Sequence, residues 1–338
     1  MTTHEKRIHT LFDYWLTSSL VLVFLTIIIG GLTRLTNSGL SITEWELFSG
    51  ILPPLNNASW EKYFDLYKQI PQFKLINPNM LLSEFKIIFY WEYFHRILAR
   101  LIGLFFLIPF IYFYFCKKIN KLYLNNCLII FFLIILQGLV GWYMVKSGLV
   151  NVVTVSHYRL SIHLSIALII ISLLFWLIIN IRNNTHKTFL KFSENNLPFN
   201  IFILIIFVQI VIGAFVSGLD AGSIYQTWPL MGNTYFPDDI SNENLLNFSN
   251  HSLVQFYHRN LAYIIIGYII ILSFYIFKKE KKELYKPLKI VLLILSFQVL
   301  MGIFTLLSGL NIFVASAHQI TSVILVFAAI NLNYLNAK

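Results

Sequence analysis

Eight apolar stretches of about 20 residues recur along this 338-residue chain, and they constrain its fold more than any other feature. A stretch of that length crosses the hydrocarbon core of a bilayer as a single α-helix. The chain is 57% hydrophobic and only 12% charged, which excludes an ordinary soluble globular protein. The sequence therefore predicts an all-α integral membrane protein with eight transmembrane helices. The predicted spans are 13–33, 87–115, 122–145, 159–181, 198–218, 254–277, 287–308 and 312–335.

The distribution of Lys and Arg predicts the orientation of these spans, because cytoplasmic loops carry an excess of both residues. The segments 117–121, 182–191 and 278–289 are rich in Lys and Arg, whereas the long loop 219–253 has neither. An even number of spans places both termini on one side, so we predict that the N- and C-termini are cytoplasmic. This topology also explains the net charge of +10, which therefore does not indicate a nucleic acid partner.

The first apolar stretch has no small-residue cleavage site after it, so we interpret it as a retained span and not as a signal peptide. The two cysteines, Cys116 and Cys127, flank a loop predicted to be cytoplasmic. That compartment is reducing, and no structural disulfide is expected.

The chain is internally duplicated. The segment 30–45 resembles the segment 213–228, and Gln137-Gly138-Leu139-Val140-Gly141 resembles Gln298-Val299-Leu300-Met301-Gly302. Each half holds four predicted spans, so the repeat is parallel, with its axis along the membrane normal. We expect two tandem, pseudo-symmetric four-helix bundles, residues 1–181 and residues 182–338.

Four histidines follow this duplication, one on every second span: His95, His163, His258 and His318. Ionisable groups inside a membrane are costly and indicate function. A pair of histidines on facing helices is the arrangement that supplies both axial ligands of a haem iron. We predict two haem sites, one per half. The chain has no Cys-x-x-Cys-His motif, so any haem is held non-covalently.

The ligand on the fourth span has two candidates. An ungapped alignment of the two halves would pair His157 with His318, but His157 precedes the apolar run and belongs at the membrane surface. His163 lies about 9 Å deeper along a helix. We choose His163, with a six-residue insertion before it, and keep His157 as the alternative.

One acidic residue distinguishes the halves. Glu92 lies three residues before His95 and on the same helix face, while the equivalent residue in the second half is Gln255. A carboxylate beside only one site suggests that acid–base chemistry takes place in the first half alone. The alternative interpretation is that Glu92 simply pairs with Arg96 or Arg100.

Four arginines near the outer ends of the spans are candidates to bind haem propionates, because a planar guanidinium matches the geometry of a carboxylate. Each could instead extend to the lipid headgroups. These arginines are Arg96, Arg100, Arg159 and Arg259.

Taken together, these motifs resemble the haem A synthase family, and the pattern is similar to its proteobacterial and mitochondrial branch. The resemblance runs over nearly the whole chain. It is carried by residues 30–45, 50–54, 92–96, 158–164, 218–222, 228–232, 257–259 and 317–319.

The family oxidises a ring methyl group of haem O to the formyl group of haem A, the cofactor of cytochrome oxidases. The resemblance implies that His95 and His163 flank the substrate haem and that Glu92 is the catalytic carboxylate. It implies that His258 and His318 ligate a resident haem b. It further implies a place in the bacterial inner membrane, with haem O synthase and cytochrome oxidase assembly proteins as partners. No motif identifies the electron donor.

One feature departs from part of the family. Some members have a cysteine pair in the first outer loop, and loop 34–86 contains no cysteine. The branch that this chain resembles also lacks the pair, so a thiol-based step is not expected on that side.

Two other classes of protein fit some of these observations. A di-haem b cytochrome that relays electrons or oxidises quinol explains the four histidines equally well, and Glu92 less well. A transporter with two repeats would use the histidines as a proton path and would bind no haem.

Overall fold

The computed structural model describes residues 3–45, 49–149, 153–240 and 244–337, and its regular structure is helical. The helices are α1 (Thr3–Leu35), α2 (Asn57–Lys68), α3 (Pro71–Ile76), α4 (Leu82–Cys116), α5 (Lys121–Gly148), α6 (His157–Arg182), α7 (Leu197–Gly218), α8 (His251–Lys278), α9 (Tyr285–Leu307) and α10 (Ile312–Asn336). Three short 3-10 helices, η1 (Ser49–Ile51), η2 (Ala221–Ser223) and η3 (Lys282–Leu284), lie between them.

Eight of these helices are long and apolar enough to cross a membrane: α1, α4, α5, α6, α7, α8, α9 and α10. Each predicted span lies within one of them to within a residue, so the all-α fold class and the number of spans are confirmed. The helices extend past the predicted spans, and α1 begins ten residues earlier, at Thr3. The side on which the termini lie and the symmetry of the halves remain predictions.

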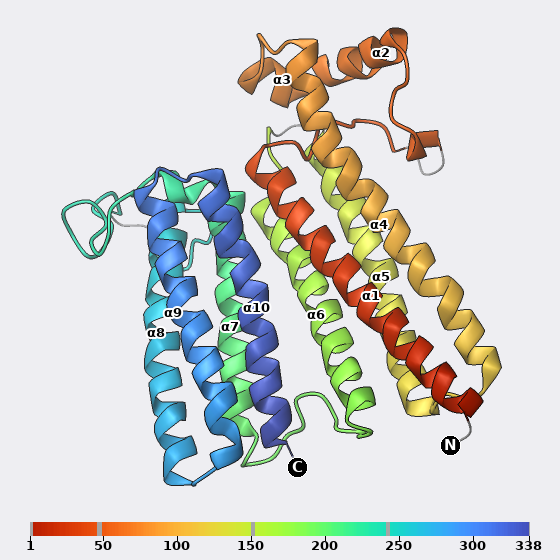
Figure 1. Ribbon diagram of the computed structural model, residues 1–338. Helices are drawn as coiled ribbons and strands as arrows, with labels where there is room; N and C mark the ends of the chain where they lie inside the picture. Colours follow the sequence, from red (N-terminus) through yellow and green to blue (C-terminus); the bar gives the residue numbers. More distant parts are fainter. Residues whose placement is uncertain (1–2, 46–48, 150–152, 241–243, 338) are drawn as a thin grey trace. The chain divides into compact units, whose positions relative to one another are not determined.

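The chain forms two compact units, Met1–Ile171 and Ser172–Lys338, and the division falls inside α6. In the first unit, α1 packs along α4 (Figure 1). The indole of Trp15 fixes their register, because its N–H donates to the Phe105 carbonyl at 3.0 Å and its ring lies 4.8 Å from that of Phe106. This hydrogen bond satisfies the polar atom of a side chain that is otherwise buried among apolar groups.

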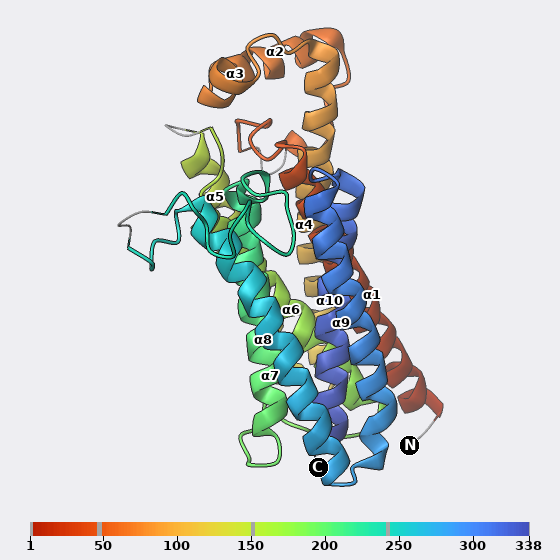
Figure 2. The ribbon, with the colours of Figure 1, turned by 90° about the vertical axis from the view of Figure 1, so that its left-hand side faces the viewer.

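The loop between α1 and α4, predicted to be an outer loop, contains two helices that the sequence did not predict. Helix α2 begins where Asn56 accepts a hydrogen bond from the Ser59 N–H at 2.8 Å, and α3 begins with Pro71 in its first turn. Figures 1 and 2 show both helices at the end of α4 that lies away from the N-terminus. Apolar side chains of α2 pack on the first turns of α4, and the cluster comprises Leu40, Ile42, Trp60, Phe64, Tyr67, Ile70, Phe85 and Phe89.

The second unit comprises α7 to α10 and the last part of α6. Phe175 and Trp176 of α6 lie 4.7 Å from Phe327 and 5.1 Å from Tyr334, ring centre to ring centre. These aromatic contacts join the last part of α6 to the second unit. The division therefore falls after Ile171, whereas the predicted boundary followed residue 181. The assignment of one functional site to each half is a prediction that the fold alone does not test.

Near the C-terminal end of α10, asparagine side chains hydrogen bond α10 to α7 and to Asn196, the residue that precedes α7. The Asn333 amide donates to Asn200 Oδ1 at 3.0 Å, and the Asn336 amide donates to Asn196 Oδ1 at 2.8 Å. All four residues are buried. Buried amides that bond to one another stabilise helix contacts where water is excluded.

The predicted orientation can be tested by labelling. With Cys116 and Cys127 replaced by Ser, the variant Asn247→Cys should react with an impermeant maleimide in intact spheroplasts, since this exposed position lies in loop 219–253, which has no Lys or Arg. The variant Lys282→Cys, in the basic connection, should react only after the membrane is permeabilised. The opposite pattern would place both termini outside the cytoplasm.

Candidate functional site

The structure brings the four predicted histidines together as two facing pairs. In the first unit the rings of His95 on α4 and His163 on α6 lie 6.4 Å apart, at an interplanar angle of 77°. In the second unit the rings of His258 on α8 and His318 on α10 also lie 6.4 Å apart, at 85°. The two pairs therefore share the same spacing and nearly the same mutual orientation.

Each histidine ring packs against a glycine of another helix. A Cβ added to Gly30 would lie 2.9 Å from Cε1 of His95, and one added to Gly141 would lie 2.9 Å from Cε1 of His163. In the second unit the corresponding distances are 3.0 Å from Gly213 to His258 and 3.0 Å from Gly302 to His318. Carbon atoms pack best at about 3.5–4.0 Å, so each ring occupies the volume that a side chain at the glycine would fill.

The spacing of the rings fits a metal between them. An imidazole nitrogen binds a first-row metal at about 2.0–2.1 Å and lies about 1.1 Å from the ring centre, so two axial imidazoles have centres about 6.3 Å apart. The observed 6.4 Å agrees with this value for both pairs. In each ring the edge that faces the glycine is Cε1 and Nδ1, while Nε2 lies farther from it. The residues present therefore fit a bis-histidine haem in each unit.

One histidine is also held by a hydrogen bond that suits a metal ligand. Nδ1 of His318 lies 3.1 Å from the Gln298 carbonyl. A ring that donates Nδ1–H to a carbonyl presents Nε2 with its lone pair free, which is the tautomer that binds a metal.

Glu92 is buried beside the first pair, and its carboxylate is held by four hydrogen bonds. Nε and Nη2 of Arg96 donate to Oε1 at 3.0 and 2.6 Å. The Ser41 hydroxyl and the Ile42 N–H each donate to Oε2 at 2.8 Å. The pairing with Arg96 that the sequence left open is thus present, and the side chains are only 3% and 11% exposed. Glu92 also fastens the first outer loop to α4.

The equivalent position in the second unit holds its loop without a carboxylate. The Gln255 amide and Nη2 of Arg259 both donate to the Tyr225 carbonyl at 2.9 Å. Nη1 of Arg259 reaches the carbonyls of Thr227 and Leu230 at 2.9 and 3.2 Å. Both units therefore join an outer loop to the histidine-bearing helix through an i,i+4 pair that ends in arginine.

The loop of the second unit is braced by Tyr225, whose hydroxyl donates to Asp238 at 2.6 Å and lies 3.0 Å from Asp239. Partial burial and these two carboxylates raise the pKa of Tyr225 above its ordinary value. The hydroxyl therefore keeps its proton and remains a donor at physiological pH. Ser252 on α8 also donates to Asp239, at 2.6 Å.

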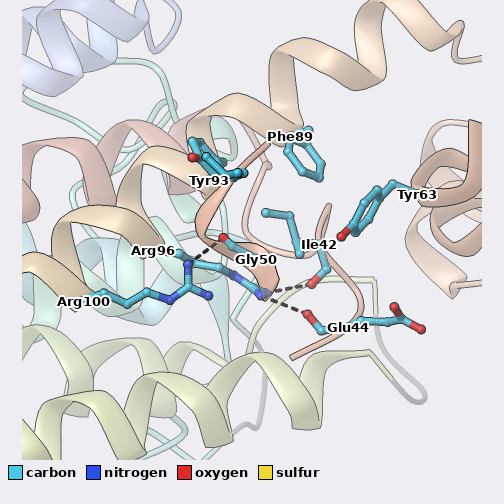
Figure 3. A pocket seen from close by; sticks show the side chains of 9 residues that line it. Ile42, Glu44, Gly50, Tyr63, Phe89, Tyr93, Arg96 and Arg100 are labelled. Atoms are coloured by element: carbon cyan, nitrogen blue, oxygen red, sulfur yellow. Dashed lines mark hydrogen bonds between the residues drawn. The ribbon is translucent and has the colours of Figure 1, made fainter. Parts of the chain in front are cut away.

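The remaining arginines contact protein groups as well. Figure 3 shows Arg96 and Arg100 side by side on α4, with Arg96 bonded to the carbonyls of Ile42 and Glu44 and Arg100 to that of Gly50. They border a cavity of about 20 Å³, enough for one water molecule. Arg159 donates to the Ser147 hydroxyl at 2.5 Å and lies over the Tyr143 ring. In this structure the four predicted propionate ligands hold loops and neighbouring helices.

His163 is the α6 histidine whose ring faces His95, whereas His157 is the first residue of α6 and its ring lies 4.0 Å from that of Tyr158. The geometry therefore favours His163 as the member of the first pair.

Three glutamines beside the histidines were missed as site residues. Gln137, Gln209 and Gln298 each lie four residues before the glycine that receives a ring. The repeat had revealed two of these Gln-x-x-x-Gly segments, but nothing in the sequence indicated that both residues would contact a histidine.

Two facing imidazole pairs on eight apolar helices define the class of this protein: a helical membrane protein with two sites of bis-histidine geometry. Residues 13–330 match the family of cytochrome oxidase assembly proteins designated COX15-CtaA. The chain belongs to this family.

Its relatives include three bacterial haem A synthases. The haem A synthase of Pelagibacter ubique is 49% identical over 332 residues, which cover 96% of each chain. That of Rickettsia africae is 40% identical over 321 residues, 94% of this chain and 95% of the relative. That of Flavobacterium psychrophilum is 40% identical over 323 residues, 92% and 94% of the two chains. With its eight spans, the chain is a multi-pass protein of the bacterial inner membrane.

The glycine contacts predict the effect of a single methyl group. The variant Gly213→Ala places Cβ 3.0 Å from Cε1 of His258, so the ring must move. Bound haem in the second unit should fall by about tenfold or more, as is typical when the support of a metal ligand is lost. The measurement is the ratio of Soret to protein absorbance in the purified protein.

Gly267→Ala is the matched control, because a Cβ at that position on α8 meets nothing within 4 Å. Alanine also favours helix over glycine, so the control should fold at least as well as the wild type. Equal haem content in the two variants would show that the ring does not depend on the glycine.

Proposed function

We propose that this chain is a haem A synthase, an enzyme that oxidises a ring methyl group of haem O to the formyl group of haem A. The observation that carries the proposal is the asymmetry between the two histidine pairs. Both pairs have the spacing of axial haem ligands, but only the first has a buried carboxylate, Glu92, on the same helix. The haem A synthases of Pelagibacter and Rickettsia support it by their similarity over almost the whole chain.

In this proposal His95 and His163 bind the substrate haem, and His258 and His318 hold a resident haem b. When bound, haem b supplies one-electron redox chemistry, which a helical protein cannot provide with its own side chains. The four glycine contacts fix the positions of the rings through the Cε1 and Nδ1 edge, and Nε2 lies farther from the glycine. The residues of the second unit thus orient an electron-transfer group, and those of the first unit bind the molecule that reacts.

Glu92 is the proposed catalytic carboxylate. Conversion of the methyl to the formyl group passes through a hydroxymethyl group and a geminal diol, and loss of water from the diol requires a proton to leave one oxygen and reach another. Arg96, Ser41 and Ile42 fix the position of the carboxylate, so in this proposal Glu92 would exchange a proton with the diol at a defined place. Gln255 cannot do this, which is consistent with a resident haem that is not modified.

The arginines are proposed to bind the haem propionates while they hold the loops. Among the four, Arg259 has a donor to spare, because its Nε is buried and has no partner among the described residues. A carboxylate is the partner that such a donor prefers. Arg96 and Arg159 would contribute through further guanidinium N–H groups, and Arg100 is a candidate because it lies beside Arg96 on α4.

The proposed partners follow from the reaction. Haem O is the substrate, so an enzyme that makes haem O must supply it, and the assembly proteins of cytochrome oxidase would receive haem A. Both transfers take place at or within the lipid bilayer, since haem O is strongly apolar. The electron donor is a separate partner.

The decisive experiment is expression of the chain together with a haem O synthase in a host that lacks haem A. The extracted haems are then separated by chromatography. A haem A synthase produces haem A, whereas a di-haem b cytochrome yields only haem b and haem O. A transporter would yield a protein without haem.

The variant Glu92→Gln should separate haem binding from the oxidation of haem O. It copies the second unit, where Gln255 and Arg259 hold the loop without a carboxylate, so the protein should fold and keep its haem. Haem A formation should fall by about a hundredfold or more, in the range expected when a general acid–base group is lost. The reciprocal variant, Gln255→Glu, places a carboxylate at the equivalent position of the second unit and serves as the control. Unchanged haem A yield in Glu92→Gln would remove Glu92 from the mechanism.

The second pair is tested by its spectrum. Replacing either His258 or His318 by Ala removes one of two axial ligands, so the low-spin b-type absorption of the second site should disappear. His157→Ala is the control on α6, and it should leave that absorption in place. Persistence of the low-spin signal in both His258→Ala and His318→Ala would mean that other side chains bind the haem.

A further inference from the structure

Gln137, Gln209 and Gln298 precede glycines that pack against histidine rings, and their side-chain amides differ in their hydrogen-bond partners. In the second unit, Gln298, the repeat equivalent of Gln137, accepts a hydrogen bond at Oε1 from the Thr321 hydroxyl. The Gln209 amide, which has Thr26 as its counterpart in the first unit, donates to the His258 carbonyl at 3.0 Å and lies 3.5 Å from His258 Nε2, and its Oε1 has no partner among the described residues. In the first unit, the amide nitrogen of Gln137 lies 3.3 Å from His163 Nε2. Gln137 Oε1 is buried and has no partner among the described residues.

The cause of this difference lies in one substitution between the repeats. Thr321 follows His318 by three residues, and the residue that follows His163 by three is Ile166. Ile166 is buried and has no polar atom to offer. Gln137 has therefore lost the hydroxyl partner that its equivalent, Gln298, retains.

The contact that Gln137 does make cannot persist when the site is filled. An amide N–H can donate to His163 Nε2 only through the lone pair of that nitrogen, and the same lone pair binds a metal. Metal binding at His163 thus leaves both ends of the Gln137 amide without a partner in the protein. Burial of an unsatisfied amide costs about 1–3 kcal/mol, so the bound molecule is expected to supply the partner.

On the basis of the proposed function, we propose that Gln137 is a substrate-binding residue that hydrogen bonds the ring substituent undergoing oxidation. This substituent starts as a methyl group, becomes a hydroxyl and ends as a formyl group. An amide suits the last two, because it can donate to either oxygen and can accept from the hydroxyl. The resident haem gains no oxygen, which is consistent with Gln298, the equivalent of Gln137, having its partner within the protein.

The formyl group itself reports this hydrogen bond, because a donor on its oxygen lowers the C=O stretching frequency. We would add haem A to the purified full-length protein and measure the frequency by resonance Raman spectroscopy. In Gln137→Leu the frequency should rise to the value for a formyl group without a donor. Ile166→Thr gives Gln137 Oε1 the hydroxyl partner found in the second unit and leaves the amide N–H donor in place, so its frequency should match that of the wild type. Leu139→Ala, an exposed neighbour on α5, should match the wild type.

A second measurement uses the haems that accumulate during co-expression with haem O synthase. Loss of one hydrogen bond of about 0.5–1.5 kcal/mol should lower the ratio of oxidised haems to haem O by roughly three- to tenfold in Gln137→Leu. The low-spin absorption of the second site shows whether the variant is folded.

The outcomes separate this inference from the proposed function. Absence of haem A in the wild type would overturn the proposed function, while the Raman comparison with added haem A would still test Gln137. A normal yield of haem A in the wild type, with the same formyl frequency in the wild type and in Gln137→Leu, would overturn the role of Gln137 alone.

Discussion

The contact between an imidazole ring and a glycine on another helix is the constraint on which the rest of this structure depends. It occurs four times, and each time the distance leaves no room for a side chain at the glycine. Helices in a membrane gain no hydrophobic energy by approaching each other, so close packing at small residues holds them together. Here the ring fills the space that the glycine provides, and the same contact both joins the helices and aims the histidine.

The outer loops depend on a second repeated device, the i,i+4 pair that ends in Arg96 or Arg259. Both arginines bond loop carbonyls, but Arg96 is balanced by Glu92 and Arg259 has only Gln255 beside it. The i,i+4 pair of the second unit therefore carries one more positive charge than the pair of the first. In the proposed assignment that charge lies near the resident haem, where it attracts propionates and favours the reduced state of the iron.

Much of this arrangement could be predicted from the sequence, because it depends on periodic or repeated signals. Hydropathy predicted the eight spans, and the duplication predicted the pairing of His95 with His163 and of His258 with His318. The loop contacts of Glu92 could not be predicted, since they require the chain to fold back over α4 at Ser41 and Ile42. Helices α2 and α3 were missed because they are short and lie outside any apolar run. The repeat identified Gln137 and Gly141 as equivalents of Gln298 and Gly302. Their contacts with the histidines could not be predicted, because these depend on how the helices pack.

Two substitutions distinguish the halves. The buried carboxylate of Glu92, which accepts four hydrogen bonds, is replaced by Gln255 in the second unit. Thr321, whose hydroxyl bonds Gln298 Oε1, is replaced by Ile166 in the first unit, where Gln137 Oε1 has no partner among the described residues. A site for a permanent cofactor is most stable when every buried polar atom has a partner within the protein. A site for a substrate that gains an oxygen must keep partners in reserve, and it is less stable when empty by roughly the cost of each unsatisfied group. In the proposed assignment, these two substitutions place a carboxylate and an amide with an unpartnered oxygen in the unit that binds the substrate.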